Sequence, residues 1–156
     1  MKVFLPGGSG LVGLNLIAIL QHNHPEWQLL VVDKKREAVE AGRHLFPMAE
    51  FLCEDLTCTS GVSWPQRLGG CDACVMLQAE IGNTDSSQFE RNNIRTTEVL
   101  LEQLKRQGIP RLVHISSSVV NSVATDLYTT TKRAQEELVQ QSWPGVVILR
   151  PTLMFE

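Results

Sequence analysis

The chain has 156 residues, of which 43% are hydrophobic and 20% are charged, and its formal net charge is −3. This composition predicts one folded globular domain and excludes a disordered chain. No apolar run reaches the roughly 18 residues of a membrane-spanning helix, and the acidic balance argues against a nucleic-acid partner. The first residues carry no signal-peptide pattern, so we expect a cytoplasmic protein without membrane or nucleic-acid partners.

The first predicted strand, residues 2–5, leads through a glycine-rich turn into a helix over residues 11–21. Two overlapping glycine patterns fit the turn, G-x-G-x-x-G from Gly8 and G-x-x-G-x-x-G from Gly7. Such a strand–turn–helix unit binds a dinucleotide, because glycine lets the backbone approach the pyrophosphate and the helix N-terminus attracts the anion. The residues expected to bind the cofactor here are Gly7, Gly10, Leu11, Val12 and Gly13.

The second predicted strand, residues 28–32, is followed by Asp33. A carboxylate about 20 residues after the glycine turn accepts hydrogen bonds from ribose hydroxyls and repels a 2′-phosphate. The basic run of residues 34–36 can instead hold that phosphate, or it simply begins a solvated helix over residues 34–48. Because Asp33 occupies the decisive position, we expect NAD rather than NADP.

The third predicted strand, residues 50–53, is followed by Asp55 and Leu56. We expect these two residues beside the adenine ring, although an aspartate there is equally consistent with a helix cap. Residues 57–70 predict a loop with one turn of helix. The tryptophans of the connecting segments are expected to cover the sheet edges: Trp27, Trp64 and Trp143.

The four cysteines are interpreted as structural thiols without disulfides. They are Cys53, Cys58, Cys71 and Cys74. A zinc site needs two pairs of ligands at suitable spacing, which the cysteines and histidines do not provide. Small buried thiols pack well in a core, and we expect no metal.

The fourth predicted strand, residues 73–77, precedes a long helix over residues 85–107. Ser87 and Glu90 have the spacing of a capping box at its start, and Gly108 is suited to its end. After the fifth strand, residues 111–115, a last helix begins at Thr125 or Asp126 and extends to about residue 141; a sixth strand covers residues 146–149. The strand–helix alternation predicts an α/β doubly wound parallel sheet, a Rossmann fold of about six strands with helices on both faces.

Three serines, residues 116–118, follow the fifth strand, and Tyr128 and Lys132 follow on the last helix. Four-residue spacing places the phenol and the amine on one helix face, about 6 Å apart along the axis. A free phenol is a poor base at neutral pH, but a nearby ammonium favours the phenolate. The same lysine can hold the nicotinamide ribose, and a serine hydroxyl can orient a substrate oxygen. This set indicates proton transfer coupled to hydride transfer.

These motifs, together with Arg150-Pro151, occur in the order typical of the extended short-chain dehydrogenase/reductases, the nucleotide-sugar epimerase/dehydratase family. Residues 92–97 also resemble the family's Asn-Val-x-Gly-Thr segment. The chain resembles the N-terminal Rossmann portion of this family over essentially its whole length. We therefore expect residues 1–156 to form an NAD(P)-binding domain without the family's C-terminal substrate domain.

The resemblance implies roles for individual residues. Tyr128 is the expected general base and acid, Lys132 its partner and a cofactor ligand, and Ser117 the catalytic hydroxyl, with Ser118 as the alternative. Ala79 and Asn93 are expected near the cofactor. Family members form homodimers, here by packing the helices 85–107 and 126–141 into a four-helix bundle.

The implied function is NAD-dependent epimerisation, dehydration or oxidoreduction of a nucleotide-sugar-like alcohol. Two alternatives remain open: a non-catalytic NAD(P)-binding sensor, and a reductase of a steroid- or flavonoid-type carbonyl. Glu80 and Asp85 are further candidates for the substrate side, and His114 is interpreted as a buried core residue with its hydrogen bonds satisfied.

Overall fold

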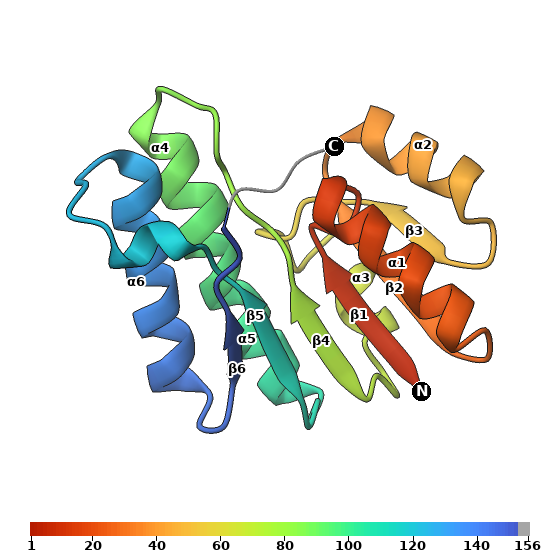
Figure 1. Ribbon diagram of the computed structural model, residues 1–156. Coiled ribbons are helices and arrows are strands. Elements are labelled where there is room, and N and C mark those ends of the chain that lie inside the picture. Colours follow the sequence, from red (N-terminus) through yellow and green to blue (C-terminus); the bar gives the residue numbers. More distant parts are fainter. Residues whose placement is uncertain (153–156) are drawn as a thin grey trace.

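The computed structural model describes residues 1–152, and its strands form one six-stranded parallel sheet (Figure 1). The strands are β1 (Lys2–Pro6), β2 (Gln28–Asp33), β3 (Glu50–Cys53), β4 (Ala73–Met76), β5 (Leu112–Ile115) and β6 (Val147–Leu149). The α-helices are α1 (Leu11–Asn23), α2 (Arg36–Leu45), α3 (Trp64–Arg67), α4 (Ser86–Phe89), α5 (Thr96–Arg106) and α6 (Leu127–Ser142). A π-helical segment, η1 (Glu90–Arg95), joins α4 to α5, and a 3₁₀ turn, η2 (Ser118–Asn121), follows β5.

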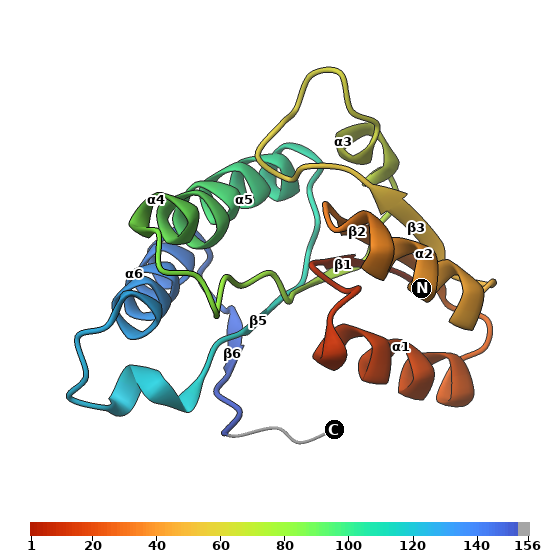
Figure 2. The ribbon, with the colours of Figure 1, turned by 90° about the horizontal axis from the view of Figure 1, so that it is seen from above.

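The strand order is β3-β2-β1-β4-β5-β6, which confirms the predicted doubly wound sheet. The chain moves outward from β1 to β3 and then crosses back to place β4 on the other side of β1. Seen from above, α1 and α2 lie on one side of the sheet, and α4, α5 and α6 on the other (Figure 2). Where the order reverses, the carboxyl ends of β1 and β4 border a crevice, the usual ligand site of such sheets.

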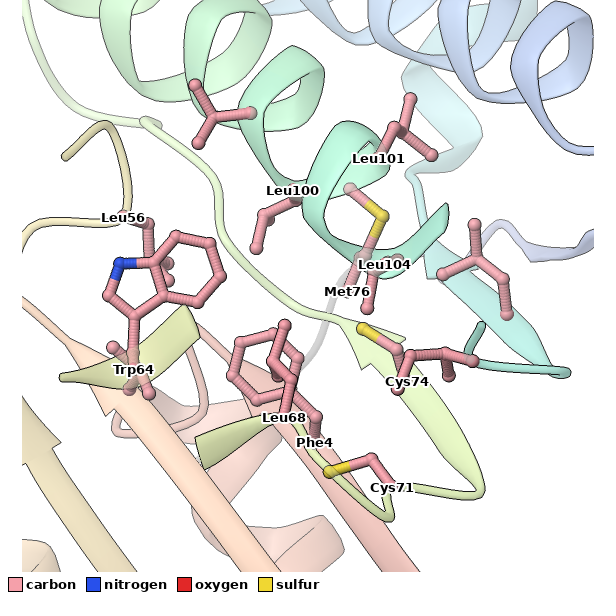
Figure 3. Packing of buried hydrophobic residues seen from close by; sticks show 14 of the residues in the cluster. Phe4, Leu56, Trp64, Leu68, Cys71, Cys74, Met76, Leu100, Leu101 and Leu104 are labelled. Carbon is pink, nitrogen blue, oxygen red and sulfur yellow. The ribbon is translucent and has the colours of Figure 1, made fainter. Parts of the chain in front are cut away.

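Side chains alternate along the central strands of the sheet, so each strand contributes to a hydrophobic core on each face. In β1, Val3 and Leu5 pack toward α1 and α2, whereas Phe4 packs toward the opposite face. The larger core lies on that opposite face, where Leu100 and Leu104 of α5 close over the sheet (Figure 3). Strands buried on both faces read as continuous apolar runs, which is why the central strands β1, β2 and β4 could be located from the sequence.

Trp64 corrects one expectation, because it does not cover a sheet edge. Its side chain is fully buried in the larger core, and its ring stacks on Phe4 of β1 with the ring centroids 6.0 Å apart (Figure 3). The indole N–H donates to the carbonyl oxygen of Cys58 at 2.8 Å. This bond satisfies the polar end of the indole, so the remainder of the ring can be buried.

The predicted capping box is also wrong. Asp85 is the N-cap of α4, and its carboxylate accepts a hydrogen bond from the backbone N–H of Ser87 at 2.8 Å. Ser87 already lies in the first helical turn, so its hydroxyl cannot cap that turn. The other two boundary signals are confirmed: Gly108 follows α5 with φ +67°, and Asp126 caps α6 by accepting from Thr129.

Cys71 and Cys74 lie in the larger core, where burial raises the pKa of the Cys74 thiol well above its ordinary value. All four cysteines carry free thiols. Within residues 1–152, no group of histidine, cysteine and acidic side chains is arranged to hold a metal ion. None of the helices in the same range is long and apolar enough to cross a membrane.

Candidate active site

The glycine turn between β1 and α1 is shaped by close backbone approaches. Gly7 has φ +75°, and a Cβ on it would lie 2.5 Å from backbone atoms of Gln78 after β4. A Cβ on Gly13 would lie 2.2 Å from the carbonyl oxygen of Gly8, so α1 can pack against the turn only with glycine there. Around Gly10, by contrast, a Cβ would meet nothing closer than 3.8 Å. The turn therefore brings α1 close to β1 and leaves open space in front of Gly10.

A cavity of about 680 Å³ opens at this turn and runs along the carboxyl ends of the strands. All five predicted residues of the glycine turn line it: Gly7, Gly10, Leu11, Val12 and Gly13. Among residues 1–152, no side chain caps α1, so the N–H groups of its first turn remain available to a ligand. A volume of this size is typical of cofactor sites. The donors and the space both fit the pyrophosphate of a dinucleotide.

Asp33 lies at the cavity wall at the end of β2, and its carboxylate is held in place. One oxygen accepts from the Ser9 hydroxyl at 2.5 Å and the other from the backbone N–H of Lys35 at 3.1 Å. Each carboxylate oxygen retains a lone pair for a ribose hydroxyl. Lys34 points its ammonium at the Asn92 side chain, 2.6 Å away. The preference for NAD therefore rests on the Asp33 carboxylate itself, which would repel a 2′-phosphate.

Asp55 and Leu56 also line the cavity, after β3. The Asp55 carboxylate accepts from the backbone and hydroxyl of Thr57 at 2.8 and 2.7 Å, and from Arg91 at 2.7 Å. Burial raises the pKa of this carboxyl, but the bonds from Thr57 and Arg91 outweigh it and hold the pKa below its usual value. Asp55 is therefore a fixed anion at the wall of the cavity. Arg91 lies 36 positions away in the chain, and no local pattern indicated this contact.

Ser117 and Tyr128 belong to the same cavity. Both line it, as does the alternative serine, Ser118. The Ser117 side chain caps η2, where its oxygen accepts from the N–H of Val119 at 3.4 Å. Tyr128 stands in the first turn of α6, half-buried. The structure thus brings the predicted hydroxyl and phenol to the lining of the cavity that opens at the glycine turn.

Lys132 follows Tyr128 by one turn of α6. It is not among the described residues that line the cavity. Its side chain is 1% exposed, and its ammonium donates to the Gln135 side chain at 2.6 Å and to the carbonyl oxygen of Ile115 at 3.1 Å. Burial lowers the pKa of the ammonium to about 8, against an opposing effect of Glu136. One of its three N–H groups is left for a further partner.

Ala79 and Asn93 are placed differently from each other. Ala79 lines the cavity after β4. Asn93 is fully buried in η1, behind the wall: its oxygen accepts from the backbone N–H of Glu80 at 2.7 Å, and its amide donates to Thr131 of α6 at 2.9 Å. Asn93 therefore ties the segment after β4 to α6 rather than facing the cavity. Glu80 does line it, whereas Asp85 is used as the cap of α4.

A second group of charged residues lies near β5, the strand that precedes the three serines. Arg150 and Glu136 form a double hydrogen bond of 3.0 and 2.7 Å between β6 and α6. Burial raises the pKa of the Glu136 carboxyl, but Arg150 outweighs it and holds the pKa below its usual value. His114 of β5 is completely buried, and both its ring nitrogens lack a hydrogen-bond partner within residues 1–152. The expectation that its hydrogen bonds are satisfied is therefore wrong.

A parallel sheet with a glycine turn at its switch point and a carboxylate after the second strand defines a dinucleotide-binding Rossmann domain. The chain belongs to the NAD dependent epimerase/dehydratase family, whose model matches residues 3–154. NAD is the cofactor of this family, and its members are NAD-dependent enzymes.

Curated relatives with detectable sequence similarity differ in substrate. The chain is 26% identical over 177 residues to a decarboxylating sterol-4-alpha-carboxylate 3-dehydrogenase of Candida albicans, covering 99% of this chain and 51% of the relative. It is 27% identical, with the same coverage, to a 4-hydroxy-2-methyl-3-oxo-4-farnesyl-3,4-dihydroquinoline-1-oxide ketoreductase of Stigmatella aurantiaca. The chain thus spans about half the length of these relatives.

Solved structures share the fold. A UDP-glucuronic acid 4-epimerase from Bacillus cereus, in complex with NAD, superposes with a TM-score of 0.82 at 23% identity, over 97% of this chain and 57% of that one. A dTDP-glucose 4,6-dehydratase from Streptomyces venezuelae, with NAD bound, gives a TM-score of 0.80 at 22% identity, over 96% of this chain and 55% of that one.

Proposed function

We propose that the protein oxidises or reduces a secondary alcohol or ketone with NAD, the cofactor extending from Asp33 to the wall that carries Ser117 and Tyr128. One observation carries this proposal: Asp33, Ser117 and Tyr128 all line a single cavity. A sensor that only binds the cofactor needs neither hydroxyl. An active site needs both within reach of one reacting carbon.

The side chains divide the chemistry between them. NAD, when bound, accepts or returns the hydride. Tyr128 takes the proton of the substrate hydroxyl as the hydride leaves, or returns it in the reverse direction. Ser117 donates to the same oxygen and fixes its position. Lys132 offers its remaining N–H to the cofactor ribose.

Cofactor choice is the first test of this proposal. Isothermal titration of the protein with NAD⁺ and NADP⁺ should show tighter binding of NAD⁺. Asp33→Ala should reduce the preference by about tenfold or more, because hydrogen bonds to a charged group contribute about 1.5–3 kcal/mol. Glu37→Ala, which removes an exposed carboxylate on α2 that does not line the cavity, is the control. Equal affinity for both cofactors in the unmodified protein would refute the assignment of Asp33.

A nucleotide sugar is the first substrate class we propose, following the family resemblance and the trifunctional UDP-glucose 4,6-dehydratase of Arabidopsis thaliana, which is 26% identical over 88% of this chain. A second class, an apolar polycyclic or prenylated ketone, is favoured by the two relatives that each cover 99% of the chain. Both classes present a secondary alcohol or ketone to the same serine–tyrosine wall.

The two classes separate in one assay. The protein is incubated with NAD⁺ and UDP- or dTDP-sugars, and in parallel with NADH and sterol or quinoline ketones. Epimer or dehydration product by mass spectrometry supports the first class, and NADH consumption with reduced ketone supports the second. Each result is accepted only if Tyr128→Phe abolishes the activity. Activity that survives this change would refute the assignment of Tyr128 as the acid–base residue.

We also propose a homodimer through α5 and α6, which lie side by side on one face of the sheet (Figure 2). The proposal rests on the family resemblance, in which these two helices pair with their copies. Light scattering should give twice the monomer mass, and a monomer at all concentrations would refute it.

A further inference from the structure

Gln78, directly after β4, is a buried polar residue beside the cavity. It lines the cavity, yet its side chain is only 8% exposed. Its amide nitrogen donates to the Thr97 hydroxyl at 3.2 Å. Its side-chain oxygen is buried and has no hydrogen-bond partner within residues 1–152. A buried acceptor without a donor is costly, so its retention points to a ligand that supplies one.

The orientation of this amide follows from a chain of buried hydrogen bonds. At one end is the Lys132 ammonium, which can only donate, so the oxygen of Gln135 must face it, as observed at 2.6 Å. The Gln135 amide nitrogen then faces the Thr97 hydroxyl, 2.9 Å away. That hydroxyl donates its proton to the backbone carbonyl oxygen of Asn93 at 2.6 Å. Thr97 can therefore only accept from Gln78.

Two consequences follow from this chain. Gln78 cannot turn its amide around, because its oxygen would then meet a Thr97 oxygen that has no proton to give. Its oxygen is thus fixed as an acceptor. The same chain connects Gln78 to Lys132 through Thr97 and Gln135, all buried at 8% exposure or less.

The location of Gln78 indicates which half of the bound cofactor would lie next to it. Its backbone packs on Gly7 in the glycine turn, where the pyrophosphate is expected. Asp33 marks the adenosine side at β2, and β4 lies on the opposite side of β1. The cofactor half on the β4 side carries the nicotinamide ribose, whose hydroxyls are donors.

We infer that Gln78 is a cofactor-binding residue whose side-chain oxygen accepts a hydrogen bond from a hydroxyl of the nicotinamide-side ribose. This inference rests on the proposed function. The buried chain links Gln78 to Lys132 through Thr97 and Gln135, so the orientation of the Gln78 amide depends on the Lys132 ammonium.

The test compares two ligands. NAD⁺ carries the nicotinamide-side ribose and ADP does not, so only NAD⁺ binding should depend on this contact. Gln78→Met keeps the length of the side chain but removes the acceptor. By isothermal titration we expect NAD⁺ affinity to fall about tenfold, the effect of one lost hydrogen bond with a buried partner, and ADP affinity to stay unchanged.

Gln103→Met is the matched control, since Gln103 is also a buried glutamine (4% exposed) but lies on α5 outside the cavity. It should change neither affinity. If Gln78→Met does not fold, Thr97→Val replaces it, because it leaves the cavity wall intact and releases the Gln78 amide. In either variant, a selective loss of NAD⁺ affinity supports the inference.

Unchanged NAD⁺ affinity, or an equal loss of affinity for NAD⁺ and ADP, overturns the inference. The Gln78 side-chain oxygen would then bind an ordered water or serve only the structure of the glycine turn. Failure of the unmodified protein to bind NAD⁺ would instead refute the proposed function. The two failures are therefore distinguishable in one set of titrations.

Discussion

Replacing His114 by leucine should make the fold less sensitive to acid. Burial is the main reason that the pKa of this imidazole falls from 6.5 to about 3; the nearby Lys132 ammonium lowers it further, and Glu136 opposes the shift. Below pH 6.5 the unfolded chain therefore binds a proton on this residue that the folded chain does not. Stability falls as the pH decreases, because the unfolded state binds more protons.

The magnitude follows from the shift. Each pH unit below the unfolded pKa costs about 1.4 kcal/mol, so the histidine should remove about 2 kcal/mol between about pH 7.5 and about pH 5. The carboxyls of Asp55 and Glu136, with lowered pKa values, keep their contributions in this range, since these are lost only at lower pH. The Lys132 ammonium, with a pKa of about 8, completes its protonation in this window and adds a small loss of the same sign. The comparison with His114→Leu therefore measures the histidine.

Urea unfolding followed by tryptophan fluorescence at the two pH values measures the effect. His114→Leu should lose about 2 kcal/mol less than the unmodified protein on acidification, and should be more stable near neutral pH because two unpaired buried nitrogens are removed. His44→Gln, on the exposed surface of α2, should behave like the unmodified protein. An unchanged acid loss in His114→Leu would refute the reasoning.

Two further predictions concern the site. Tyr128→Phe should reduce turnover of any substrate about 10²–10⁴-fold while leaving NAD⁺ affinity by calorimetry unchanged, and near-normal turnover would transfer the acid–base role to another group. Gly13→Ala should destabilise the fold by about 1–3 kcal/mol in urea, because the new Cβ would lie 2.2 Å from the Gly8 oxygen. Gly82→Ala, with nothing within 4 Å, is its control, and equal effects of the two would contradict the close approach of α1 to the turn.

Much of the candidate site could be located from local patterns. The glycine turn follows a strand and opens a helix, and its spacing is imposed by backbone contacts between residues only a few positions apart, such as Gly8 and Gly13. Asp33 could be placed because the end of a buried strand is visible in the sequence. Tyr128 and Lys132 share one face of α6 for the same local reason, the helical repeat.

What these residues do with their hydrogen bonds depended on the packing of distant segments. The sequence alone determined the order of strands and helices, the glycine turn and the residues at the carboxyl ends of the strands, because each is encoded by neighbours in the chain. Only the tertiary structure decided that Lys132 bonds to Gln135 and that Arg91 reaches Asp55 across 36 positions. It also decided that Gln78 and His114 keep buried atoms without a partner in residues 1–152. Such contacts form when α5, η1 and α6 pack on the sheet, and no local repeat or propensity carries that information.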